Sequence, residues 1–130
     1  MGALLTRGMA EIIRISTKLG ANPSTLYGLS GMGDLIATCS SPLSRNHTVG
    51  AMIAQGKKID DILRDLGSVA EGVQTSKALC ELAKKFDVEV PVSNAIYQAV
   101  YTDTPAKEVF MNLMNRKLKE EEKYVWQNLQ

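Results

Sequence analysis

The chain has 130 residues, of which 22% are charged, and its formal net charge is +1. This length suits one domain, and the near-neutral charge argues against a general attraction to nucleic acid or to an anionic membrane surface. No run reaches 18 apolar residues, and the first residues lack the apolar run of a signal peptide, so we expect neither a membrane span nor a leader. Two cysteines without a CxxC spacing favour a reduced, cytoplasmic compartment over a secreted disulfide scaffold.

Charge is distributed unevenly along the chain. Residues 20–56 contain two charged side chains, Asp34 and Arg45, where the average composition predicts about eight. One interpretation is that this segment is the buried part of the domain, and the other is that the two charges serve a function. Composition alone favours burial of this segment and leaves a function of the two charges open.

Apolar residues recur at helical spacing, which predicts an all-α domain of about seven helices joined by short turns. We expect helices over residues 5–19, from 23, and over 34–39, 45–55, 59–66, 71–86, 91–101 and from 105. Glycines 20, 56 and 67 are expected to stop helices, and Asn22, Ser44 and Thr104 to cap them. Residues 88–92 contain Pro91 and are interpreted as an extended connection.

The same spacing predicts which side chains face inward. The inward sets include Leu19, Thr75, Ile96 and Phe110, and both Cys39 and Cys80 are expected to be buried. Residues 1–115 are predicted to form the helical domain and residues 116–130 a charged tail. Because Met1 stands before a helix without a capping residue, we expect the chain to be a piece of a longer protein.

Three glycines lie close together in the segment Gly28-Leu-Ser-Gly31-Met-Gly33. The dinucleotide-binding fingerprint is GxGxxG after a strand, whereas this segment reads GxxGxG and no strand precedes it. The pattern therefore favours a tight turn between helices over a nucleotide loop.

Asp34 and Thr38 are four residues apart and share a face if the segment is helical. A carboxylate and a hydroxyl at that spacing can hold a polyol-like substrate. The alternative is that Asp34 caps the short helix.

Ser44, Arg45 and Asn46 fall at the start of a predicted helix. The amides of a first helical turn have no intrahelical partner, and the helix dipole there favours an anion. An arginine fork and an asparagine amide beside those amides would form a phosphate site. The alternative is a surface arginine that reaches back to a carboxylate of its own helix.

The remaining polar residues give weaker signals. Glu71 begins a predicted helix, where a glutamate is favourable to the dipole without any function. His47 has no partners at metal-ligand spacing, so no metal site is predicted. The serines near residue 40 lack the GxSxG elbow of a serine hydrolase.

Several motifs together resemble the NAD(P)-dependent glycerol-3-phosphate dehydrogenase family, in its bacterial type. They are Gly31-Met-Gly33-Asp34-Leu35-Ile36-Ala37-Thr38-Cys39, then Ser44-Arg45-Asn46 and Gly50, then Val69-Ala-Glu71-Gly72, and later Val90-Pro-Val92. The resemblance covers about residues 2–115. It implies an all-helical substrate domain similar to the C-terminal domain of 6-phosphogluconate dehydrogenase.

The resemblance also implies roles for individual residues. Asp34 would contact the hydroxyl end of glycerol 3-phosphate, with Thr38 on the same motif. Ser44, Arg45 and Asn46 would hold the substrate. Cofactor contacts would come from Arg45, Val69 and Glu71.

In that family a preceding Rossmann domain binds NAD or NADP and a preceding lysine acts as the general base, and this chain contains neither. We therefore expect no catalytic residue in residues 1–130 and no turnover by the chain alone. The expected partners are glycerol 3-phosphate, dihydroxyacetone phosphate and the Rossmann domain. The oligomeric state stays open, with a homodimer as one option, because loss of a partner domain exposes an apolar face.

Two other functions are alternatives for this sequence. A sibling dehydrogenase acting on a hydroxy acid would leave the cluster at residues 44–46 without a purpose. A stand-alone helical interaction or DNA-binding module would require a basic stripe, which the sequence lacks.

Overall fold

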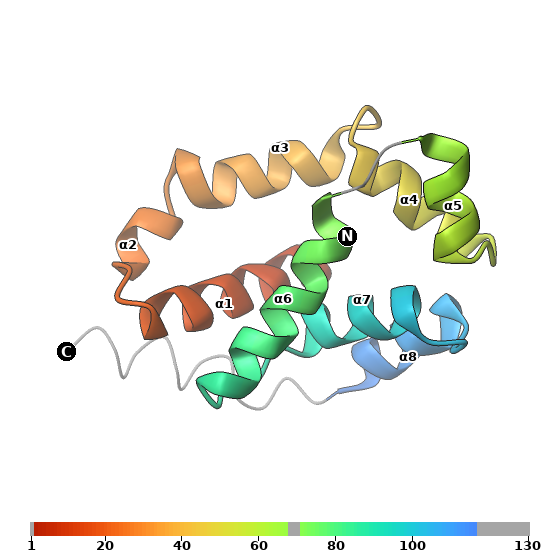
Figure 1. The fold of residues 1–130 in the computed structure, drawn as a ribbon. Helices are drawn as coiled ribbons and strands as arrows, with labels where there is room; N and C mark the ends of the chain where they lie inside the picture. Colours follow the sequence, from red (N-terminus) through yellow and green to blue (C-terminus); the bar gives the residue numbers. More distant parts are fainter. Residues whose placement is uncertain (1, 68–70, 117–130) are drawn as a thin grey trace.

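The computed structural model describes residues 2–67 and 71–116, and within them it contains helices and no strand (Figure 1). The all-α prediction is confirmed. The elements are α1 (Gly2–Lys18), α2 (Pro23–Leu26), the π-helical turn η1 (Leu29–Gly33), α3 (Asp34–Ser40), α4 (Arg45–Ala54), α5 (Ile59–Leu66), α6 (Glu71–Lys85), α7 (Pro91–Tyr101) and α8 (Ala106–Asn115). Residues 117–130 of the predicted tail lie outside the described residues.

Local signals determine where most helices begin and end. The Asn22 side chain accepts a hydrogen bond from the Ser24 amide at 3.0 Å and caps α2. Gly20, Gly56 and Gly67 have φ values of 89°, 86° and 59°, a left-handed conformation that glycine adopts without a steric penalty. These three stops are confirmed. The expected cap at Thr104 is wrong by one position, because Pro105 is the N-cap of α8.

Gly31 supports the turn interpretation of the glycine-rich segment. A Cβ atom on Gly31 would lie 2.1 Å from the carbonyl oxygen of Leu26. The backbone of η1 thus comes so close to the end of α2 that only glycine fits. The segment makes a tight connection between α2 and α3, as predicted.

Two apolar clusters form the core. One joins α4, α5, α6 and α7 through Val49, Ile62, Val73 and Val100. The other joins α1 and α6 to the α6–α7 connection through Ile15, Ala83 and Val90. Because α6 contributes to both clusters, it is the central element, and Figure 1 shows it crossing the middle of the molecule.

Several predicted inward residues face solvent instead. Leu19 is 55% exposed because α1 ends one residue earlier. The buried residues of α7 are Ser93 and Val100 rather than Ile96, since Ser93 binds a buried carboxylate. Phe110 on α8 and Thr75 on α6 are also exposed, because each lies next to the buried residues of its helix and not among them. Spacing predicted the helices correctly, but the neighbouring elements determine the buried face.

The expected burial of residues 20–56 is also wrong. All of this segment is described, and Val49 is its one buried residue. Leu29 and Leu43 are 91% and 90% exposed. Cys39, predicted to be buried, is exposed as well. The reason is that α2, η1 and α3 form a single layer over α1 (Figure 1), so one side of this layer has no cover.

Two buried charges on α1 hold the ends of two other helices. The Glu11 carboxylate is 2% exposed and accepts hydrogen bonds from the amides of Val92 and Ser93 and from the Ser93 hydroxyl. These amides open α7, whose N-cap Val90 offers no side-chain acceptor. Glu11 therefore caps α7 from a different helix, and its negative charge meets the positive end of the helix dipole.

Arg7, one turn earlier on α1, does the converse at the end of α8. Its guanidinium donates to the carbonyl oxygens of Leu113 at 2.6 Å and Arg116 at 3.3 Å. Both carbonyls belong to the C-terminal end of α8, where a positive charge is favourable. Neither buried charge was predicted from the sequence.

None of the described helices combines the length and the apolar character needed to cross a bilayer.

Replacing Glu11 by alanine should destabilise the fold strongly. The substitution leaves buried donors of Val92 and Ser93 without an acceptor, which should lower the free energy of unfolding by about 3 kcal/mol. Urea denaturation of Glu11→Ala measures this change. Glu81→Ala, at an exposed position on α6, is the matched control and should change stability by less than about 0.5 kcal/mol. Equal effects of the two substitutions would contradict the capping role.

Glu11 should also make stability depend on pH. Burial raises the pKa of its carboxyl above the ordinary value of 4.5, although the hydrogen bonds from Val92 and Ser93 and the charge of Arg14 oppose the shift. The folded state then binds the proton more tightly than the unfolded state does. The stability contributed by this group is fully present below pH 4.5 and is lost as pH rises through the raised pKa.

Urea denaturation between about pH 4 and pH 8 tests this sign. The stability of the unsubstituted chain relative to Glu11→Gln should fall as pH rises, because glutamine does not titrate there. A difference that grows with pH would show that the carboxyl has a lowered pKa.

Candidate functional site

The N-terminal ends of α4 and α6 meet at one place on the surface. Ser44 is the N-cap of α4, and its hydroxyl accepts a hydrogen bond from the His47 amide at 3.5 Å, as the sequence predicted. Arg45 is the first residue of α4, and Glu71 is the first residue of α6. Two sets of first-turn amides, each at the positive end of a helix dipole, therefore lie side by side.

A single side-chain hydrogen bond joins these two helix ends. The Asn46 side-chain oxygen Oδ1 accepts from the Gly72 amide at 3.1 Å. Gly72 is the second residue of α6, so its amide has no acceptor within its own helix. Asn46 thus satisfies an amide of α6 while it belongs to the first turn of α4.

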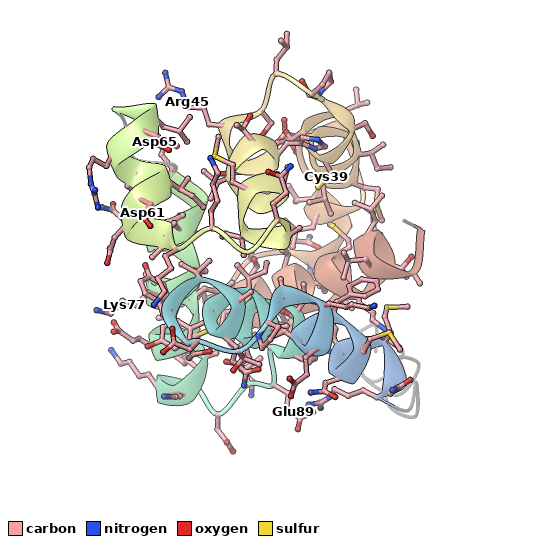
Figure 2. The ribbon with its side chains drawn as sticks, turned by 90° about the vertical axis from the view of Figure 1, so that its right-hand side faces the viewer. Cys39, Arg45, Asp61, Asp65, Lys77 and Glu89 are labelled. Carbon is pink, nitrogen blue, oxygen red and sulfur yellow. The ribbon has the colours of Figure 1, made fainter. Side chains whose placement is uncertain are left out.

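An open hollow of about 280 Å³ lies at this junction, lined by Ser44, Arg45, Asn46 and Glu71. Arg45 is exposed, and Figure 2 shows its side chain pointing outward. The arginine, the asparagine amide and the first-turn amides provide donors for an anion. The Glu71 carboxylate accepts hydrogen bonds, so it suits a hydroxyl group on the same ligand or on a neighbouring one.

The structure brings together some predicted residues and not others. Ser44, Arg45, Asn46 and Glu71 line one hollow, although they come from two segments of the sequence. Asp34 and Thr38 are exposed on α3, one helical turn apart, and are not among its lining residues. The alternative that Asp34 caps α3 is wrong, because the N-cap is Gly33 and Asp34 lies inside the first turn. Val69 lies outside the described residues.

Cys80 is buried, as expected, and its surroundings do not activate it. Burial raises the pKa of its thiol and outweighs the opposing charge of Lys84. Within residues 2–67 and 71–116, no three His, Cys, Asp or Glu side chains are grouped so that they could hold a metal ion. The donors of Ser44, Arg45 and Asn46 at the hollow suit an anion, and the Glu71 carboxylate suits a hydroxyl group.

Gly72 is the site residue that sequence reasoning missed. In the sequence it stands out only as part of the motif Val69-Ala-Glu71-Gly72. Its contact with Asn46 spans 26 residues, and no local pattern reports a contact of that range. The available signal was a glycine inside the first turn of a helix, where intrinsic helix propensity disfavours it.

A comparison with protein families shows to which family the chain belongs. The family model described as NAD-dependent glycerol-3-phosphate dehydrogenase C-terminus matches residues 1–111. The chain belongs to this family. The match includes α1 to α7 and every residue discussed for the site, from Asp34 to Gly72.

Individual relatives agree with the family match. The chain is 52% identical over 121 residues to a glycerol-3-phosphate dehydrogenase [NAD(P)+] of Anaeromyxobacter dehalogenans strain 2CP-C. The aligned region covers 93% of the chain and 36% of the relative. It is 49% identical over 119 residues to the enzyme of the same name from Lacticaseibacillus casei strain BL23, covering 92% and 34%.

A crystal structure of glycerol-3-phosphate dehydrogenase from Coxiella burnetii has the same fold, with a TM-score of 0.84 and 30% identity over 88% of the chain and 35% of that structure. The chain thus spans about a third of the length of the relatives that it matches.

Proposed function

We propose that this chain is the substrate half of an NAD(P)-dependent glycerol-3-phosphate dehydrogenase, which interconverts glycerol 3-phosphate and dihydroxyacetone phosphate and supplies the precursor of phospholipids. The observation that carries this proposal is the hollow lined by Ser44, Arg45, Asn46 and Glu71, where two helix N-termini meet. A phosphate monoester needs several donors converging on one place, and this junction offers them.

The substrate phosphate is assigned to Arg45, Asn46 and Ser44. Arg45 adds positive charge to a helix end that is already positive, which is unfavourable for α4 itself. A bound phosphate removes this repulsion, because its two negative charges face the guanidinium and the first-turn amides. The hydroxyl end of the substrate is assigned to Asp34 and Thr38 on α3.

The cofactor contacts of this half are assigned to Arg45, Val69 and Glu71. NAD or NADP supplies hydride transfer when it is bound. Arg45 suits a phosphate of either cofactor, and the Glu71 carboxylate suits a sugar hydroxyl. The general-base lysine and most of the cofactor site belong, in this proposal, to a nucleotide-binding domain that this chain does not contain.

The uncovered layer of α2, η1 and α3 is the face proposed for that domain. Leu29 on η1 and Leu43 in the connection after α3 are exposed apolar residues, and the segment contains few charges to desolvate. A second copy of the chain is the other candidate for the same face. The exposed free thiol of Cys39 fits a reducing, cytoplasmic location.

Arg45→Ala should impair the assembled enzyme, in which the chain is joined to a nucleotide-binding domain. Loss of a charge-assisted contact to the phosphate should cost about 2–4 kcal/mol of transition-state binding, seen chiefly as a higher KM for dihydroxyacetone phosphate. Steady-state oxidation of the reduced cofactor measures this effect.

Arg64→Ala is the matched control for Arg45→Ala. Arg64 is an exposed arginine on α5 that pairs with Asp61 at 2.9 Å, away from the hollow. It should leave KM within about twofold, since exposed ion pairs contribute little. A change below about twofold for Arg45→Ala itself would contradict the phosphate assignment.

The 130-residue chain alone should not catalyse the reaction, because this proposal assigns the general base and most of the cofactor site to the nucleotide-binding domain. Oxidation of NADH or NADPH in the presence of dihydroxyacetone phosphate is the assay. Turnover above the rate without protein would show that the chain is a complete enzyme.

A further inference from the structure

We infer that Gly72 is a positioning residue, which turns the Asn46 carboxamide so that its NH₂ group faces the substrate phosphate. This inference rests on the proposed function, since it concerns how the phosphate site at the α4–α6 junction is built. Gly72 itself would touch neither substrate nor cofactor.

The orientation of Asn46 follows from its hydrogen bond. The Gly72 amide is a donor, so the atom that it meets at 3.1 Å must be the carboxamide oxygen. The nitrogen Nδ2 is then the donor end of the carboxamide that remains for a ligand. Among the described residues neither of its hydrogens has an acceptor, and Asn46 lines the hollow in which an anion could accept them. Without Gly72, the oxygen could face the hollow and repel an anion.

The absence of a side chain at position 72 is required for space. A Cβ atom there would lie 2.7 Å from Oδ1, 2.9 Å from Cγ and 3.0 Å from Nδ2 of Asn46. Its φ is not positive, unlike those of Gly20, Gly56 and Gly67, so the backbone at this position does not demand glycine. Close contact with the carboxamide accounts for the glycine.

This geometry predicts what Gly72→Ala would do. The atoms in the way form the end of a short side chain rather than a backbone, so Asn46 can rotate aside and α6 can still form. The expected consequence is a folded chain whose Asn46 carboxamide is displaced from the hollow. Gly50→Ala is the matched control, because Gly50 lies on the same helix as Asn46 and its Cβ would meet nothing within 4 Å.

Hydrogen exchange of the Gly72 amide tests the contact directly. An amide in the first turn of a helix has no intrahelical acceptor, so protection there reports Asn46. In the 130-residue chain, NMR should show this amide protected about fivefold relative to an open amide. Asn46→Ala should abolish the protection, and Asn46→Asp should keep it because a carboxylate oxygen also accepts. An unprotected Gly72 amide in the unsubstituted chain would overturn the inference.

Titration with glycerol 3-phosphate, followed by NMR, tests the positioning role. Gly72→Ala should weaken binding about tenfold, as expected for the loss of a hydrogen bond to a charged group, whereas Gly50→Ala should stay within twofold. Asn46→Asp should keep the Gly72 contact and still lose binding, since it places a negative charge beside the phosphate. If Asn46 only connected the two helices and did not face the phosphate, the Asn46→Asp chain would bind glycerol 3-phosphate normally.

The outcomes separate this inference from the proposed function. If the unsubstituted chain binds glycerol 3-phosphate and Gly72→Ala binds equally well, the positioning role is wrong and the proposed function is unaffected. If the unsubstituted chain does not bind although Gly72 is protected, the phosphate site is wrong. In that case the positioning role is overturned with it.

Discussion

The packing of the helices depends on two opposite charges buried one turn apart on α1. Glu11 closes the start of α7, and Arg7 closes the end of α8. Each charge meets a helix end of the opposite sign, so hydrogen bonds and the dipole offset part of its desolvation. The C-terminal end of α7 is joined to α6, because the Tyr101 hydroxyl donates to the Val73 carbonyl at 3.0 Å. Val73 adjoins Gly72, so these contacts reach from α1 to the candidate site.

The sequence predicted the helices better than their contacts. Asn22, Ser44 and the three stop glycines act through atoms within a few residues, so local pattern suffices for them. The burial of Arg7 and Glu11 depends on helix ends more than 80 residues away. A charged residue on an amphipathic helix is ordinarily exposed, and nothing local marks these two as exceptions.

The same distinction applies to the site. The cluster at residues 44–46 was predicted because a helix start suffices to make it, and Glu71 was added through the family resemblance. The role of Gly72 is visible only once α4 and α6 are side by side. The low charge of residues 20–56 predicts burial, yet the layer of α2, η1 and α3 within them is exposed, because low charge is common to cores and to interfaces. Composition alone does not distinguish the two.

A crystal structure of the 130-residue chain with glycerol 3-phosphate would test the central claim most directly, that the junction of α4 and α6 is the phosphate site. The phosphate should lie within hydrogen-bond distance of Asn46 Nδ2 and the Arg45 guanidinium, in the hollow bordered by Glu71. A phosphate bound elsewhere on the chain, with Asn46 and Arg45 contacting only water, would contradict it.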